Sequence, residues 1–181
     1  MQVQHQNDFT ARASLLSVLG AIAEHVAGNR SVSHLVRRSL DSLDDEEQDA
    51  AIWASEQLIK VDGEFARATI GHVVKMLTDP SIPLNLHGRL INILGSSHSS
   101  AADDSFQSLS HHLKGLNTSC PMAGTNMRIA SRCANQLLNL AIRIPQLSQP
   151  IAENLIDCAI KDRGNDNVTK TKFNILEFVL K

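Results

Sequence analysis

The sequence predicts an all-α protein of stacked antiparallel helix pairs, with a compact helical bundle as the alternative. Aromatic residues make up only 3% of the 181-residue chain, so Leu, Ile, Val and Ala must fill the core. All-β folds use more aromatic and β-branched residues than this. Apolar residues recur at helical spacing along the chain, and no segment shows sustained strand-like alternation. The length suits one domain over residues 1–181, with about nine helices.

The N-terminal part divides into four predicted helices at polar and glycine breaks. Gly28 ends the first helix, and Ser31 is the expected N-cap of the second. Acidic residues 44–47 open the third helix, where they complement the positive end of the helix dipole. Asp62 and Gly63 break the chain before the fourth helix. The first two of these helices are expected over about 9–27 and 31–42.

Two prolines mark a sharp corner between the fourth and fifth predicted helices. Pro80 ends the fourth helix, because the residue before a proline is pushed out of the α region. Pro83 lies where a first helical turn tolerates a residue without an N–H group. Polar linkers then separate the later helices. These are expected to begin after 104, over about 125–143 and 149–161, and from 168 to the end.

The corner resembles a HEAT repeat. That family ends one helix with a Leu-x-Asp-Pro turn and places a basic residue near the second turn of the next. Leu77-Thr78-Asp79-Pro80 followed by Arg89 has this arrangement, and residues 159–180 form a weaker copy. Helix starts near 45, 83, 125 and 168 are separated by 38, 42 and 43 residues, within or close to the solenoid range of about 40–47. The resemblance implies a HEAT-like or armadillo-like stack.

The sequence shows no catalytic or metal-binding motif, so we predict no cofactor and no metal and lean away from an enzyme. His111 and His112 are adjacent and would point about 100° apart on a helix, which does not suit one metal ion. Cys133 and Cys158 lie on apolar stripes and are expected to be buried thiols. The net charge of −2 and the scarcity of aromatic residues make nucleic acid an unlikely partner.

One polar stripe is a candidate binding surface. No acidic residue lies between Asp104 and Glu153. Within 125–143, polar and basic residues recur every three or four positions opposite the leucine stripe, as on an amphipathic helix. We call this set the polar ridge; it consists of Arg128, Arg132, Gln136, Asn139 and Arg143. It is either an ordinary solvated helix face or a surface for an anionic partner, which would be an acidic peptide segment or a phosphate-bearing ligand.

The C-terminal segment is a candidate contact between copies of the chain. Ile175, Phe178 and Val179 add a second apolar side to the last predicted helix. Exposed apolar patches larger than a few hundred Å² usually mark interfaces. We therefore predict that they meet a second copy or a partner, unless the monomer itself covers them.

These observations favour a protein that binds other proteins as a scaffold, adaptor or regulator. The alternative is a helical-repeat enzyme or a nucleic-acid-binding repair module. No apolar run approaches the ~20 residues of a membrane span. Three cysteines without a paired spacing fit a reducing compartment, and the sequence therefore predicts a cytoplasmic protein.

Overall fold

The computed structural model describes residues 3–79, 82–116 and 123–161, and every regular element in these ranges is helical. The all-α prediction is therefore confirmed. The chain forms two compact units, residues 1–79 with 96–101 and residues 80–95 with 102–181. This division does not test whether the units form one domain, so the single-domain prediction stays a prediction.

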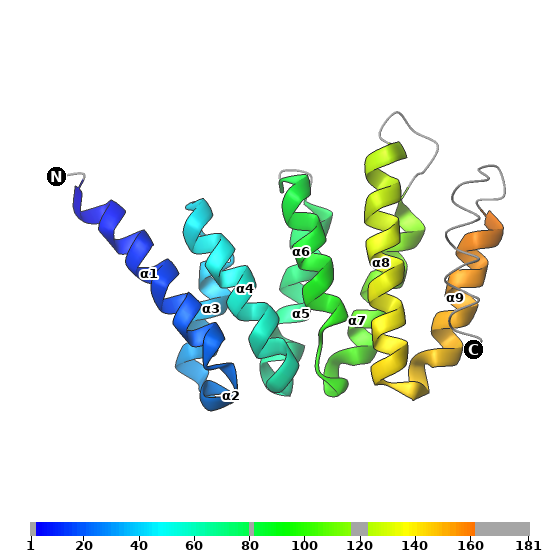
Figure 1. Ribbon diagram of the computed structural model, residues 1–181, viewed down its shortest axis with the longest axis horizontal. Helices are drawn as coiled ribbons and strands as arrows, with labels where there is room; N and C mark the ends of the chain where they lie inside the picture. The colour runs from blue at the N-terminus through cyan, green and yellow to red at the C-terminus, as the bar shows by residue number, and fades with distance from the viewer. Residues whose placement is uncertain (1–2, 80–81, 117–122, 162–181) are drawn as a thin grey trace. The chain divides into compact units, whose positions relative to one another are not determined.

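The first unit has two layers of helices. In Figure 1, α1 and α4 lie side by side in one layer, and α3 and α5 lie behind them. Fully buried apolar side chains such as Leu16, Ile52 and Leu58 fill the space between the layers. The elements are α1 (Val3–Ala21), α2 (Ala23–Val26), α3 (Arg30–Ser39), α4 (Asp45–Val61), α5 (Gly63–Thr78) and the 3₁₀ turn η1 (Ser99–Ala101).

A glycine lets α1 approach α4 closely. A Cβ atom on Gly20 would lie only 2.6 Å from Cε3 of Trp53 and 3.0 Å from the Cα atom of Ala54. The Trp53 ring therefore covers the backbone of α1, and its outer edge leaves the residue 36% exposed. Trp53 therefore lies at the edge of this core.

Side-chain caps set the starts of α3, α4 and α5 in this unit. Asn29 caps α3 by accepting hydrogen bonds from the N–H groups of Ser31 and Val32, at 3.0 and 3.3 Å. The expected N-cap at Ser31 is therefore wrong by two residues. Asn29 is the N-cap, because its amide oxygen accepts from the first free N–H groups of the helix. Asp44 caps α4 through the N–H of Glu47, at 2.9 Å, as the acidic cluster predicts.

The second unit is organised around the contact between α6 and α8. These helices lie side by side, α7 packs against both, and α9 packs against α7 and α8 (Figure 1). Leu90, Leu109 and Leu137 are fully buried in its core. The elements are α6 (Leu84–Gly95), α7 (Ala102–Gly115), α8 (Ala123–Arg143), the 3₁₀ turn η2 (Pro145–Leu147) and α9 (Ser148–Lys161).

The observed helices match most of the predicted boundaries. Pro83 directly precedes α6, and α8 covers the predicted 125–143 segment. The predicted first helix is divided, because Ile22 has non-helical backbone angles between α1 and α2. The last predicted helix, with Ile175, Phe178 and Val179, lies outside the described residues.

Candidate binding surfaces

Three basic side chains form a row on one side of α3. Arg30, His34 and Arg37 lie at positions i, i+4 and i+7 of the helix, which places them on a common face. All three are exposed, and α3 contains no acidic residue. Within the described part of the chain, none of the three makes an ion pair or a side-chain hydrogen bond. We call these residues the basic row.

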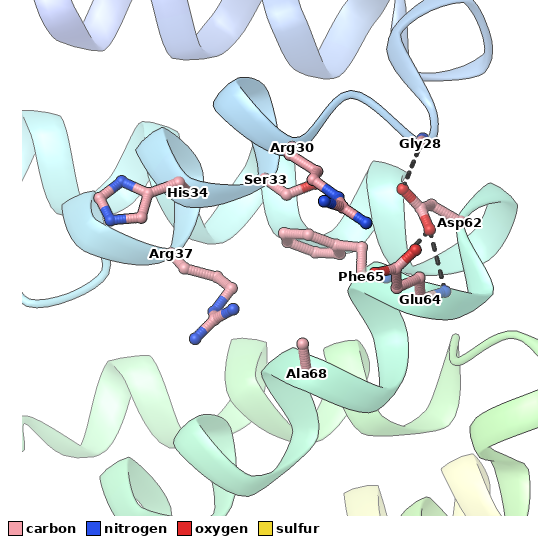
Figure 2. A pocket seen from close by; sticks show the side chains of 9 residues that line it. All are labelled: Gly28, Arg30, Ser33, His34, Arg37, Asp62, Glu64, Phe65 and Ala68. Carbon is pink, nitrogen blue, oxygen red and sulfur yellow. Dashed lines mark hydrogen bonds between the residues drawn. The ribbon is translucent and has the colours of Figure 1, made fainter.

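The basic row lines a pocket between α3 and α5 with a volume of about 220 Å³. Figure 2 shows Arg30 and Arg37 extending from α3 toward α5, with the Phe65 ring between them in this view. Phe65 is only 2% exposed, so its ring is a fixed apolar part of the wall. The lining residues are Gly28, Arg30, Ser33, His34, Arg37, Asp62, Glu64, Phe65 and Ala68.

Asp62 joins the two sides of this pocket by accepting three hydrogen bonds from backbone N–H groups. Its Oδ2 atom accepts from the N–H of Gly28 at 2.7 Å. Its Oδ1 atom accepts from the N–H groups of Glu64 and Phe65 at 3.0 and 2.9 Å. One carboxylate therefore caps α5 and fixes the turn before α3. Gly28 has a φ of +76°, a left-handed conformation that favours glycine in this turn.

The pKa of Asp62 is lowered from its usual value. Burial alone would raise the pKa, because it penalises the charged form. The hydrogen bonds from Phe65, Gly28 and Glu64 and the nearby His98 outweigh that penalty. Asp62 thus stays ionised, with its oxygens committed to the backbone. Glu64 is the exposed carboxylate of the pocket.

A second pocket in the same unit lies on α1, α3 and the turn before α4, with a volume of about 480 Å³. Its Glu47 carboxylate is 2% exposed and accepts hydrogen bonds from Ser39 at 2.7 Å and Ser42 at 2.9 Å. Arg12 lies 3.7 Å from Glu47 and stacks over the Phe9 ring at 5.1 Å. Glu47 and Arg12 therefore contact each other, which makes this wall a structural feature of the α1–α3–α4 junction.

The polar ridge lies on α8, and most of it contacts α6. A Cβ atom on Gly88 would lie 2.7 Å from Cζ of Arg132, so the guanidinium covers that glycine. The Gln136 side chain likewise covers Gly95, where a Cβ atom would lie 2.6 Å from the Gln136 Cβ. Gln136 donates to the Asn92 amide oxygen at 3.0 Å, and Arg143 donates to the Gly95 carbonyl at 3.2 Å.

The predicted burial pattern of α8 is confirmed. Cys133 and Leu137 are fully buried and Leu138 is 8% exposed. Arg128, Arg132 and Arg143 all remain exposed. Burial nevertheless lowers the pKa of Arg143, because its guanidinium lies partly against α6. Asn139 donates to Gln136 at 3.2 Å, so it continues the same polar contact. Nothing in these contacts tests whether the ridge binds a partner, and that stays a prediction.

The remaining candidates for chemistry are unremarkable in the described ranges. Burial raises the pKa of the Cys133 thiol to about 12, so it remains protonated and unreactive at neutral pH. The pKa of His112 is lowered by burial and by the neighbouring His87 and His111. Among the described residues, no three His, Cys, Asp or Glu side chains are grouped to hold a metal ion. No described helix is long and apolar enough to cross a membrane.

The fold and these surfaces define an all-helical protein with basic and polar surfaces in two compact units. A model of the family described as Integrator complex subunit 7, N-terminal, matches residues 1–128. The chain belongs to this family.

Known relatives carry the same description. Integrator complex subunit 7 of Drosophila melanogaster is 35% identical over 106 residues, which cover 59% of this chain and 11% of that protein. The Gallus gallus protein is 34% identical over 100 residues, and the Homo sapiens protein is 34% identical over 99 residues. Each of those two matches covers 55% of this chain and 10% of the relative. The chain therefore matches about a tenth of the length of these relatives.

The cytoplasmic prediction is wrong, because Integrator is a nuclear complex. The prediction rested on reduced cysteines and on the absence of a membrane-length apolar run. Nucleus and cytosol are both reducing aqueous compartments, so these features do not distinguish them.

Sequence reasoning missed the basic row and the part played by Asp62. The signal for the row was present, since Arg30, His34 and Arg37 have helical spacing in a segment without acidic residues. The Asp62–Gly28 hydrogen bond joins residues 34 positions apart, and no local pattern announces such a contact.

Proposed function

We propose that this chain is a protein-binding part of a subunit 7 of an Integrator complex and that it acts in the nucleus. The match of the Integrator subunit 7 N-terminal family to residues 1–128 carries this proposal. A protein named as a subunit of a complex has other proteins as its partners. The role of this part is that of a non-enzymatic scaffold that presents helical surfaces to those partners.

The helix arrangement supports a repeat-like scaffold. In the first unit, α1 and α4 lie in front of α3 and α5; in the second, α6 and α8 lie side by side with α7 packed against both, as in stacked helix pairs. We propose that the helix pairs are irregular HEAT-like repeats. Repeat stacks of this kind bury their core between neighbouring pairs and leave long helical faces for binding.

The partner is proposed to be acidic where it meets the basic surfaces of the chain. Arg30 and Arg37 in the first unit and Arg128 in the second are exposed arginines on such surfaces. Complementary charge sets the orientation and the rate of association more than the final affinity. Self-association through Ile175, Phe178 and Val179 remains a separate proposal, which light scattering on the chain and on its Phe178→Glu variant would test.

Affinity purification tests the proposed function. An epitope-tagged copy of the chain, expressed in cells of its own organism, should enter the nucleus and co-purify other Integrator subunits. A helical protein of similar size and net charge serves as the control for nonspecific capture. The proposal fails if the tagged chain is folded by circular dichroism but retains no more Integrator subunits than this control.

A further inference from the structure

We propose that the pocket between α3 and α5 binds a carboxylate side chain from an acidic segment of a partner protein. Arg30 and Arg37 are the residues that hold it. This inference rests on the proposed function and gives the partner's chemistry at a specific site. The site lies on α3 and α5 in the first unit, whereas the polar ridge lies on α8 in the second. Its arginines also make no contact within the described chain of the kind that Arg132 and Arg143 make.

The first argument is that the two arginines are available. Arg30 and Arg37 are exposed, and among the described residues they have no ion pair or side-chain hydrogen bond. Arg132, by contrast, lies over Gly88, and Arg143 donates to the Gly95 carbonyl. An arginine that already contacts its own protein must give up that contact before it binds a partner. The arginines of the basic row need not.

The second argument concerns the charge that a ligand would meet. Both carboxylate oxygens of Asp62 accept hydrogen bonds from backbone N–H groups, and neither forms an ion pair with Arg30. Glu64, in the first turn of α5, is the one lining carboxylate without such bonds among the described residues. The pocket therefore holds two arginines beside two carboxylates, of which Asp62 points to backbone N–H groups and Glu64 is exposed. Neither arginine forms an ion pair with them among the described residues, so an incoming carboxylate can pair with Arg30 or Arg37. Arginine suits this task, because its planar fork can bind a carboxylate through two parallel hydrogen bonds.

The third argument concerns size and shape. A volume of about 220 Å³ accommodates one or two side chains rather than a folded surface. Ala68 is exposed and gives the pocket an apolar floor, against which the methylene groups of a Glu or Asp side chain can pack. The cations and this floor together match a short extended segment that carries acidic residues.

The same features disfavour a nucleic acid at this site. Proteins that bind single strands present exposed aromatic rings for base stacking. Phe65 is the aromatic residue of the pocket and is 2% exposed, so its ring offers no free face to a base. RNA binding is therefore an outcome of the test that would overturn the proposal.

The test uses the 181-residue chain and a short fluorescein-labelled peptide of alternating glutamate and serine, followed by anisotropy. The same peptide with glutamine in place of glutamate measures binding that does not depend on charge. The double variant Arg30→Glu with Arg37→Glu should weaken binding of the glutamate peptide by about tenfold, because it removes the charged contacts to the peptide.

The matched control is Arg38→Glu with Arg67→Glu, which changes the net charge equally. Both residues are exposed and outside the pocket, and Arg38 is the immediate neighbour of Arg37. This variant should weaken binding by less than about twofold, through the general field alone. Thermal melting followed by circular dichroism should show the same fold in both variants.

A gain-of-binding variant guards against effects on folding. Glu64→Gln removes the free carboxylate of the pocket and should strengthen peptide binding by about twofold. A purely structural effect would not improve affinity.

The inference is overturned if the wild-type chain does not distinguish the two peptides, or if both double variants lose binding equally. It is also overturned if an RNA oligonucleotide displaces the labelled glutamate peptide more effectively than the unlabelled peptide does, and if this RNA binding is lost in the Arg30→Glu, Arg37→Glu variant. Affinity purification of the wild-type chain separates the two proposals. If the wild-type chain retains Integrator subunits and the peptide does not bind, only this inference fails; if the wild type retains none, the proposed function fails.

Discussion

The basic side chains of α3 and α8 have the same helical spacing and opposite uses. On α8, Arg132 and Gln136 lie across two glycines of α6, and Arg143 donates to an α6 carbonyl. On α3, Arg30, His34 and Arg37 line a pocket, and none of them has an ion-pair or hydrogen-bond partner among the described side chains. In the first unit, the corresponding fixing contacts come instead from the buried carboxylate of Asp62.

The difference shows that an amphipathic polar face does not by itself identify a binding surface. The α8 face was the stronger signal in the sequence, because no acidic residue lies within the 48 positions between Asp104 and Glu153. Glycines at 88 and 95 nevertheless allow its long side chains to pack on the neighbouring helix. The shorter row on α3 keeps its cations available, since a different residue holds its helix in place.

The largest effect should follow from Asp62→Ala. The substitution leaves the N–H groups of Gly28, Glu64 and Phe65 without their acceptor, and should lower the free energy of unfolding by about 2–3 kcal/mol. Asp62→Asn keeps an oxygen for the α5 cap but places an N–H₂ group near Gly28, so about 1 kcal/mol is expected. Urea unfolding followed by the fluorescence of Trp53, the single tryptophan, reports on this unit. Equal losses in both variants would contradict the assignment of the two oxygens.

The next effect compares two glycines. Gly95→Ala should destabilise the α6–α8 contact by about 1–2 kcal/mol, because the new Cβ meets Gln136 and overpacks the interface. Gly71→Ala on α5 meets no atom within 4 Å and should stabilise the first unit by about 0.5–1 kcal/mol through helix propensity. Hydrogen exchange of the α6 and α8 amides measures the first variant, and Trp53 fluorescence the second. If the α6 and α8 amides exchange no faster in Gly95→Ala than in the wild type, the ridge is not packed on α6.

A smaller effect compares two arginines. Arg143→Ala removes the hydrogen bond to the Gly95 carbonyl and should cost about 1 kcal/mol in the second unit. Arg37→Ala removes an exposed side chain that holds no partner in the described structure and should change stability by less than about 0.5 kcal/mol. Amide exchange in α8 and urea unfolding monitored at Trp53 measure the two variants. A larger loss for Arg37 than for Arg143 would reverse the comparison between the two helices.

The smallest expected effect is a pH dependence in the first unit. The pKa of Asp62 lies below the ordinary value of 3.8 when the chain is folded, so its ionised form stabilises the fold above that value. This contribution is lost as the pH falls through 3.8 toward the lower folded pKa. The stability difference between wild type and Asp62→Asn should therefore narrow as the pH falls below 3.8. A difference that widens in acid would mean that the pKa of Asp62 is raised rather than lowered.

The sequence by itself determined the helical class, most helix boundaries and the buried stripe of α8. Those features depend on interactions within a few residues. Asp44 caps the N–H of Glu47 three positions away, and Cys133 and Leu137 share a helix face because they lie one turn apart. Pro83 likewise acts on the backbone at its own position, and Asp62 caps the residues that directly follow it, so the breaks before α5 and α6 were predictable.

Only the tertiary structure decided which polar side chains contact another helix or turn of the same chain. The Asp62 carboxylate finds Gly28, and Arg132 and Gln136 find Gly88 and Gly95, across separations of 34 to 44 residues. Periodicity describes which residues share a face of one helix, but not which helix lies opposite that face. A polar stripe therefore has the same sequence whether it meets solvent, a partner or a glycine of a neighbouring helix. On α8 the polar side chains pack on α6, because glycines without a Cβ atom let the two helices approach closely. On α3 the arginines stay available, because the Asp62 carboxylate accepts from backbone N–H groups and does not pair with them.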